Sequence, residues 1–218
     1  MNRRTVVAAA LASVSAQAAA FAQGSPGAPD LSRYPVGPLP PDFFTAWRTG
    51  QGAVGDWHVV ADASASQGKA IEQASKDPTD YRFPLAVYQP LPAQDVRASV
   101  RFKAVAGKVD RAGGLAVRLT DADNYYVVRA NALEDNVNFY RVVKGRRQQV
   151  KGASVKVSSG EWHTLGFEAQ GARFSVTFDG KALFTAEDRT FTGLGKVALW
   201  TKADSVTRFD QLEVRPLQ

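Results

Sequence analysis

Apolar and polar residues alternate one by one along much of the chain. Between positions 96 and 104 every second residue is apolar, and the residues between them are Arg, Ser, Arg and Lys. A side-chain period of two is typical of a strand that buries one face. The same alternation recurs at 115–120, 125–131, 137–144, 163–169, 174–178, 196–202 and 209–214.

Short turn sequences separate these runs. Asp179-Gly180 follows an alternating run and indicates a tight two-residue hairpin, while residues 121–124 have the composition of a turn. No segment keeps a helical period beyond about two turns, and no internal repeat is evident. The pattern therefore predicts an all-β chain, a two-sheet antiparallel β-sandwich with about ten to thirteen strands.

The first 22 residues have the composition of a secretory signal peptide. Arg3 and Arg4 precede an Ala-rich apolar stretch, and small residues flank Phe21 at the expected cleavage position. We expect cleavage near Ala22 and a periplasmic or secreted location in a bacterium. The apolar stretch is too short and too Ala-rich for a stable membrane span in the mature form.

The remaining chain divides into two parts. Residues 23–41 are rich in Pro and Gly and predict a linker or a lead-in strand. Residues 42–218 carry the alternating runs and predict one β-domain. The chain has no cysteine, which excludes disulfides, thiolate catalysis and thiolate zinc sites.

Charge gives little reason to expect a nucleic-acid partner. The formal net charge is +6, and Arg3 and Arg4 of the predicted signal peptide supply two of these charges. The one dense basic cluster, residues 144–147, has the composition of a hairpin tip. Nucleic-acid binding would favour a basic stripe interleaved with aromatic residues. The sequence does not predict the oligomeric state.

The order and spacing of several short motifs resemble a known superfamily. These motifs are Gly55-Asp56-Trp57, Gly113-Gly114-Leu115, Asn124 to Arg129, Glu161-Trp162-His163, Phe178-Asp179-Gly180 and Gly193 to Trp200 leading to Phe209-Asp210. Together they resemble the concanavalin A-like lectin/glucanase superfamily, and within it the bacterial 3-keto-disaccharide hydrolase (DUF1080-like) domains. The resemblance implies a jelly roll of two curved sheets with a concave ligand face. It does not decide the function, because the superfamily holds glycosidases, lectins and carbohydrate-binding modules.

The polar positions of the central runs suggest carbohydrate as the partner. Arg, Asn and Tyr side chains offer planar hydrogen-bonding groups and a ring, which suit a ligand rich in hydroxyl groups. We expect Trp200 to point away from the core and, with Tyr140, to stack on a sugar ring. The candidate binding residues on the concave face are Arg118, Arg129, Asn131, Asn138, Tyr140 and Trp200. The structural alternative for the arginines is ion pairing with acids such as Glu134.

Candidates for catalysis are weaker. The resemblance implies that a family 16 glucanase would carry Glu-x-Asp-x-x-Glu, and the chain lacks this motif. A 3-keto-glycoside hydrolase is the alternative function, with His163, Glu134 and Asp135 as the groups that could move a proton. However, His163 shares parity with Leu165 and Phe167, which favours a buried, hydrogen-bonded histidine. We therefore name no catalytic residue, and an envelope interaction or scaffold protein stays a third reading.

Asp210 is a candidate ligand of a structural calcium ion. It shares parity with Leu212 and Val214, and a carboxylate that faces inward is costly unless it is paired, hydrogen-bonded or bound to a metal. The resemblance implies a calcium ion held by a late-strand acid, with Asp42 or the turn at 52–55 supplying other oxygen ligands. The alternative is an Asp that accepts backbone N–H bonds. No other cofactor is expected.

Overall fold

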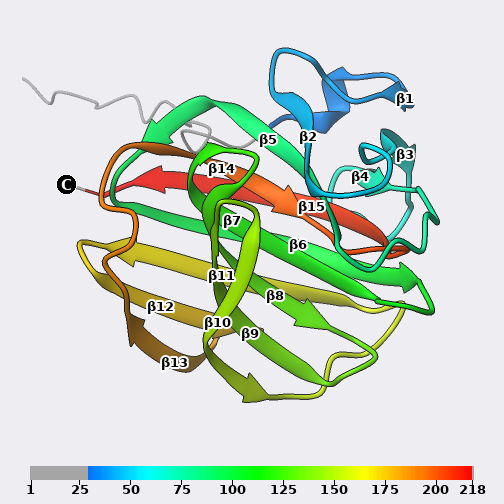
Figure 1. Cartoon of the computed structure of the whole chain (residues 1–218). Coiled ribbons are helices and arrows are strands. Elements are labelled where there is room, and N and C mark those ends of the chain that lie inside the picture. The colour runs from blue at the N-terminus through cyan, green and yellow to red at the C-terminus, as the bar shows by residue number, and fades with distance from the viewer. Residues whose placement is uncertain (1–28, 218) are drawn as a thin grey trace, which may run out of the picture.

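The computed structural model describes residues 29–217 and shows two antiparallel sheets packed face to face (Figure 1). The predicted two-sheet sandwich is confirmed, with fifteen strands in residues 29–217 rather than ten to thirteen. The eight-stranded sheet has the order β1 (Gly37–Pro38), β3 (Trp57–Ala61), β4 (Lys69–Gln73), β15 (Val206–Pro216), β6 (Val96–Ala106), β11 (Trp162–Gln170), β12 (Arg173–Phe178) and β13 (Lys181–Glu187). The seven-stranded sheet has the order β10 (Arg146–Ser154), β9 (Asn136–Val143), β8 (Asn124–Asn131), β7 (Ala112–Asp121), β14 (Gly195–Trp200), β5 (Arg82–Ala93) and β2 (Phe44–Gly50).

The main core lies between the two sheets and follows the alternation in the sequence. The apolar positions of β6, from Val96 to Ala104, are all buried, and they face the inner side chains of the seven-stranded sheet. Three rings from both sheets form part of the centre, where Phe139 packs at 5.3 Å from Phe167 and at 4.9 Å from Phe174 between ring centroids. Aromatic contacts at these distances add to the free energy gained by burial.

The N-terminal segment belongs to the folded domain. The 3₁₀ turn η1 (Leu31–Arg33) buries Leu31 in the main core, and β1 pairs with β3. The Lys69 ammonium donates to the backbone carbonyl of Ser32 at 3.2 Å. The division of residues 23–218 into a lead-in and one domain stays a prediction. The predicted signal peptide lies outside the described residues. Residues 29–217 contain no helix with the length and hydrophobicity that a membrane span requires.

One carboxylate fastens the loop before β7 to the loop before β15. Asp204 accepts hydrogen bonds from the backbone N–H groups of Lys108 at 2.7 Å, Val109 at 3.0 Å and Asp110 at 3.0 Å. Burial alone would raise the pKa of Asp204, but these three donors hold the pKa below its ordinary value. The ionised carboxylate therefore stabilises the folded state.

We expect Asp204→Asn to lower the free energy of unfolding at neutral pH by about 1.5–3 kcal/mol, the range for hydrogen bonds to charged groups. A lowered folded-state pKa gives stability that is present above the unfolded pKa and lost as the pH falls through the folded value. The difference between the two proteins should therefore shrink below about pH 4. Urea unfolding at neutral and acidic pH measures this, and an equal difference at both pH values would contradict the role of the charge.

Candidate functional site

The outer face of the seven-stranded sheet, where the sequence placed the sugar site, is filled by its own side chains. Trp200 points to this face, as its parity predicts, but it is 0% exposed. Its ring stacks on Phe83 at 5.3 Å between centroids, and its indole N–H donates to the Tyr125 hydroxyl at 3.2 Å. Eleven buried residues form this second cluster: Phe83, Leu85, Val87, Ala116, Leu119, Tyr125, Val127, Tyr140, Val142, Ala198 and Trp200. The prediction that Trp200 and Tyr140 form an open stacking platform is therefore wrong.

Contacts between opposite parts of the sheet close this hollow. The Tyr81 hydroxyl, just before β5, donates to the carbonyl of Gly145 at 3.0 Å and accepts from the N–H of Arg147 at 2.7 Å. The Arg147 guanidinium then lies 4.9 Å from the Phe83 ring centroid and 4.5 Å from that of Tyr140. Because β10 is an edge strand and β5 lies beside the other edge, these contacts require a strongly curved sheet.

Arg118 lies on the other side of its strand, toward the sheet interface. Its backbone has a φ of 49°, and the pairing of β7 with β8 shifts register between Val117 and Asp121. Such a bulge adds a residue and interrupts the alternation of faces. The Arg118 guanidinium donates to Gln94, Phe191 and Gly171 carbonyls and pairs with Asp95 at 2.9 Å. Its assignment to the ligand face is therefore wrong, and it joins loops instead.

The remaining predicted binding residues lie close together but are occupied by protein partners. Arg129 pairs with Glu134 at 2.6 Å, which is the structural alternative given for the arginines. Asn131 donates to Asp110 at 2.8 Å. Asn138 donates to the Tyr140 hydroxyl at 3.1 Å. All of these side chains except that of Glu134 are buried, so in this conformation they present no surface to a ligand.

The groups considered for catalysis also serve the fold. His163 is buried, its Nε2 accepts from the N–H of Ser158 at 3.0 Å, and its Nδ1 lies 2.8 Å from an Asp179 oxygen. Because a backbone N–H can only donate, Nδ1 carries the proton and donates to Asp179. Glu134 and Asp135 lie in the turn between β8 and β9 and bind Arg129 and Lys156 respectively. The expectation of a buried, hydrogen-bonded His163 is confirmed.

Asp210 has partners of its own. Its carboxylate pairs with Arg101 at 3.0 Å and accepts from the N–H of Ser66 at 2.7 Å and of Gln211 at 2.8 Å. Asp42 accepts from the Tyr34 hydroxyl at 2.6 Å. Among residues 29–217 no three His, Asp or Glu side chains are grouped so that they could hold a metal ion. Hydrogen bonds and an ion pair thus offset the cost of burying Asp210, so its burial does not by itself require the calcium ion that the resemblance implied.

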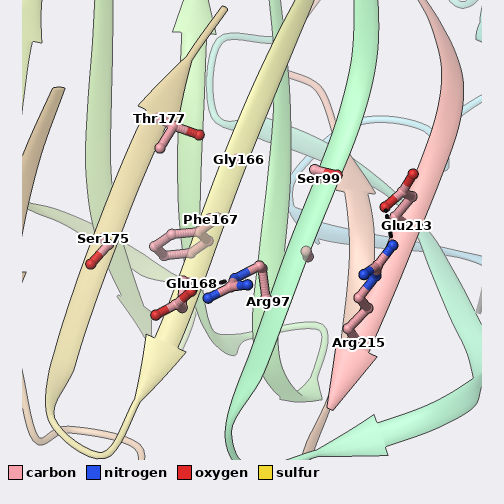
Figure 2. Close-up of a pocket in the computed structure, with 10 residues that line it drawn as sticks. Arg97, Ser99, Gly166, Phe167, Glu168, Ser175, Thr177, Glu213 and Arg215 are labelled. Atoms are coloured by element: carbon pink, nitrogen blue, oxygen red, sulfur yellow. Dashed lines mark hydrogen bonds and ion pairs between the residues drawn. The ribbon is translucent and has the colours of Figure 1, made fainter. Parts of the chain in front are cut away.

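Solvent-exposed polar groups gather instead on the outer face of the eight-stranded sheet. A groove of about 290 Å³ lies over the neighbouring strands β12, β11, β6 and β15, and Figure 2 shows the residues that line it. Two rows of aligned residues cross them. One row contains Thr177, Gly166, Ser99 and Glu213, and the other contains Ser175, Glu168, Arg97 and Arg215.

Gly166 creates the hollow at the centre of this groove. A Cβ at this position would lie 2.3 Å from the Thr177 hydroxyl oxygen, so the absence of a side chain makes room for this hydroxyl. The backbone of Gly166 does not lie in the left-handed region, so its conformation does not demand glycine. The missing side chain therefore lets the Thr177 hydroxyl lie over Gly166 and keeps this part of the groove free of a larger side chain.

Two ion pairs border the hollow. The Arg97 Nε lies 2.5 Å from Glu168, and the side chains are 63% and 25% exposed. Arg215 lies 3.2 Å from Glu213, and these side chains are 53% and 44% exposed. The groove thus offers donors and acceptors to solvent at a net charge of zero. The sequence placed Arg97 and Ser99 outward, but it gave no sign that residues from 97 to 215 would meet.

We expect Trp200→Ala to cost about 3–5 kcal/mol in the free energy of unfolding, as for other buried aromatic residues. Trp200→Phe keeps a ring on Phe83 and should cost clearly less. Chemical denaturation monitored by circular dichroism compares the three proteins. A Trp200→Ala protein as stable as the unmutated chain would show that Trp200 is not part of a packed cluster.

We expect EDTA to leave the melting temperature unchanged, because Arg101, Ser66 and Gln211 already satisfy the Asp210 carboxylate. A ligand that binds only the folded state raises its stability, so removing a structural ion must lower the melting temperature. Thermal melts with EDTA and with added Ca²⁺ test this. A fall that Ca²⁺ reverses would establish the calcium site.

Comparison with solved structures gives the same fold. The chain matches the carbohydrate-binding module CBM66 from Bacillus subtilis with a TM-score of 0.63 at 20% identity, over 79% of this chain and 96% of that one. A mixed-linkage glucan GH16 protein from Bacteroides ovatus matches with a TM-score of 0.60 at 9% identity, over 81% and 96%. The Bacillus licheniformis β-glucanase matches with a TM-score of 0.51 at 12% identity, over 79% and 98%.

These matches confirm the concanavalin A-like jelly roll, while the finer resemblance to 3-keto-disaccharide hydrolase domains stays a prediction. No curated protein sequence matches the chain. A family model, described as the C-terminal lectin domain of galactocerebrosidase, matches residues 96–217, which is more than half of the chain. The match begins at β6 and includes all four strands of the groove. The chain therefore belongs to the family of galactocerebrosidase C-terminal lectin domains.

Proposed function

We propose that this domain recognises a glycan and that it binds it in the groove around Gly166. The observation that carries the proposal is the pair of exposed Arg–Glu contacts beside a hollow that a missing side chain leaves open. Membership in a family of lectin domains supports carbohydrate as the partner. The filled outer face of the seven-stranded sheet supports placing the site on the eight-stranded sheet.

The groove has the hydrogen-bonding groups that sugar hydroxyls require. Each hydroxyl both donates and accepts, while guanidinium only donates and carboxylate only accepts. Arg97 and Glu168 place these two kinds of group side by side, and Ser99 and Thr177 add hydroxyls next to the hollow. A sugar ring over Gly166 would therefore reach complementary groups on neighbouring strands.

Export is the second part of the proposal. It rests on the sequence of residues 1–22, which has a basic start, an Ala-rich apolar stretch and a small-residue cleavage position. A glycan-binding domain in the periplasm or outside the cell would meet polysaccharides directly. Mass spectrometry of the mature N-terminus tests this proposal, with cleavage near Ala22 expected and an intact Met1 in the exported fraction contradicting it.

We expect Gly166→Val to weaken glycan binding by about tenfold or more, which corresponds to about 1.4 kcal/mol. The new Cβ would lie 2.3 Å from the Thr177 hydroxyl oxygen, so Thr177 would have to move and the Val side chain would project into the groove. Gly193→Val is the matched control, because no atom outside its chain neighbours lies within 4 Å of a Cβ built there. A glycan array followed by calorimetry on the bound glycan measures both. Failure of the unmutated protein to bind any glycan, or equal binding by both variants, would contradict the proposal.

A further inference from the structure

We infer that the groove selects uncharged glycans and discriminates against acidic ones such as uronates and sulfated sugars. This inference rests on the proposed function and specifies its ligand class. The observation behind it is the pairing of every charge that borders the groove and of every cation on β6 and β15, rather than the presence of any one residue. Figure 2 shows the two pairs that border the groove, Arg97 with Glu168 and Arg215 with Glu213.

The same pairing continues along β6 and β15 beyond the groove. Every Arg and Lys of these two strands lies within 3.2 Å of a carboxylate oxygen. The remaining pairs are Arg101 with Asp210 at 3.0 Å, Lys103 with Asp62 at 2.6 Å and Arg208 with Glu72 at 2.6 Å. The chain carries a formal charge of +6, yet none of that excess lies on these two strands without a partner. Surfaces that attract polyanions instead expose cations of one sign.

An acidic ligand would meet a carboxylate beside each guanidinium. To bind Arg97 with its own carboxylate, such a ligand would have to displace Glu168 or lie next to it. Displacement would leave Glu168 without its partner, and proximity would bring two like charges together. Both outcomes oppose binding.

A neutral ligand can bind without breaking either pair. The Arg97 contact with Glu168 uses Nε, so the two terminal nitrogens of that guanidinium keep their N–H donors free of hydrogen bonds to the described residues. Glu168 keeps further lone pairs, because a carboxylate has about four acceptor positions. One hydroxyl can accept from Arg97 while its neighbour donates to Glu168, so an adjacent pair of hydroxyls fits this arrangement.

The second ion pair repeats this arrangement on the next strand. Arg215 and Glu213 come from alternate positions of β15 and therefore share a face, with a spacing of about 7 Å along the strand. The residues opposite them on β6 are Arg97 and Ser99. A sugar in the hollow thus has donor and acceptor groups on two sides, and all four charged side chains remain paired.

The first experiment screens the unmutated protein on an array that holds matched neutral and acidic polysaccharides. Galactan with polygalacturonate and dextran with dextran sulfate are suitable pairs. We expect all specific binding on the neutral members and little change with added salt, because screening weakens only interactions between charges. Salt-sensitive binding that favours the acidic members would overturn this inference and leave the proposed function standing. Absence of binding to any glycan would overturn both.

The second experiment changes the balance of charge. Glu168→Gln gives the groove an excess positive charge and removes one acceptor. We expect it to lose about tenfold or more in affinity for the neutral glycan found on the array and to gain salt-dependent binding to polygalacturonate.

The matched control is Glu187→Gln, which makes the same change of charge at the exposed end of β13, outside the groove. Glu187 forms no ion pair with the described residues. We expect this control to keep the affinity for the neutral glycan and to gain no specific binding to polygalacturonate. Circular dichroism melts establish that both variants fold. The inference is overturned if the two variants behave alike.

Discussion

Burial of the central strands of the seven-stranded sheet on both faces is the constraint on which the rest of the structure depends. Its inner face packs against the eight-stranded sheet, and its outer face packs against itself through the cluster around Trp200. A sheet that is covered on both sides has no surface left for a ligand. The groove that borders exposed Arg–Glu pairs therefore lies on the outer face of the eight-stranded sheet.

The alternation in the sequence was enough to predict the fold and the face of most side chains. The apolar residues of β6 enter the core, and Trp200 takes the opposite side from Leu199, as their parity indicates. The odd or even position of a residue in a strand predicts the face of the sheet on which its side chain lies. It does not predict what covers that face. Coverage here comes from curvature and from contacts such as that of Tyr81 with Gly145, which are 64 residues apart. A local pattern contains no information on such contacts.

Two other features could not be predicted from short stretches of the sequence, for related reasons. The bulge at Arg118 interrupts an alternation that looks continuous in the sequence, because a single residue adopts a φ of 49°. The groove joins strands that are distant in the chain, since β6 and β15 pair although Ser99 and Glu213 lie more than half the chain apart. Gly166, a residue without a side chain in an otherwise regular strand, does not by itself show which strands lie beside it.

The most direct test of the account is a map of the bound glycan on the two sheets. Amide chemical shifts followed by NMR during titration with a glycan that the protein binds would provide it. The account predicts the largest changes at Ser99, Gly166, Glu168 and Thr177, on the eight-stranded sheet. Changes centred on Trp200 and Tyr140 would contradict it, because they would show that the seven-stranded sheet opens its buried face to the ligand.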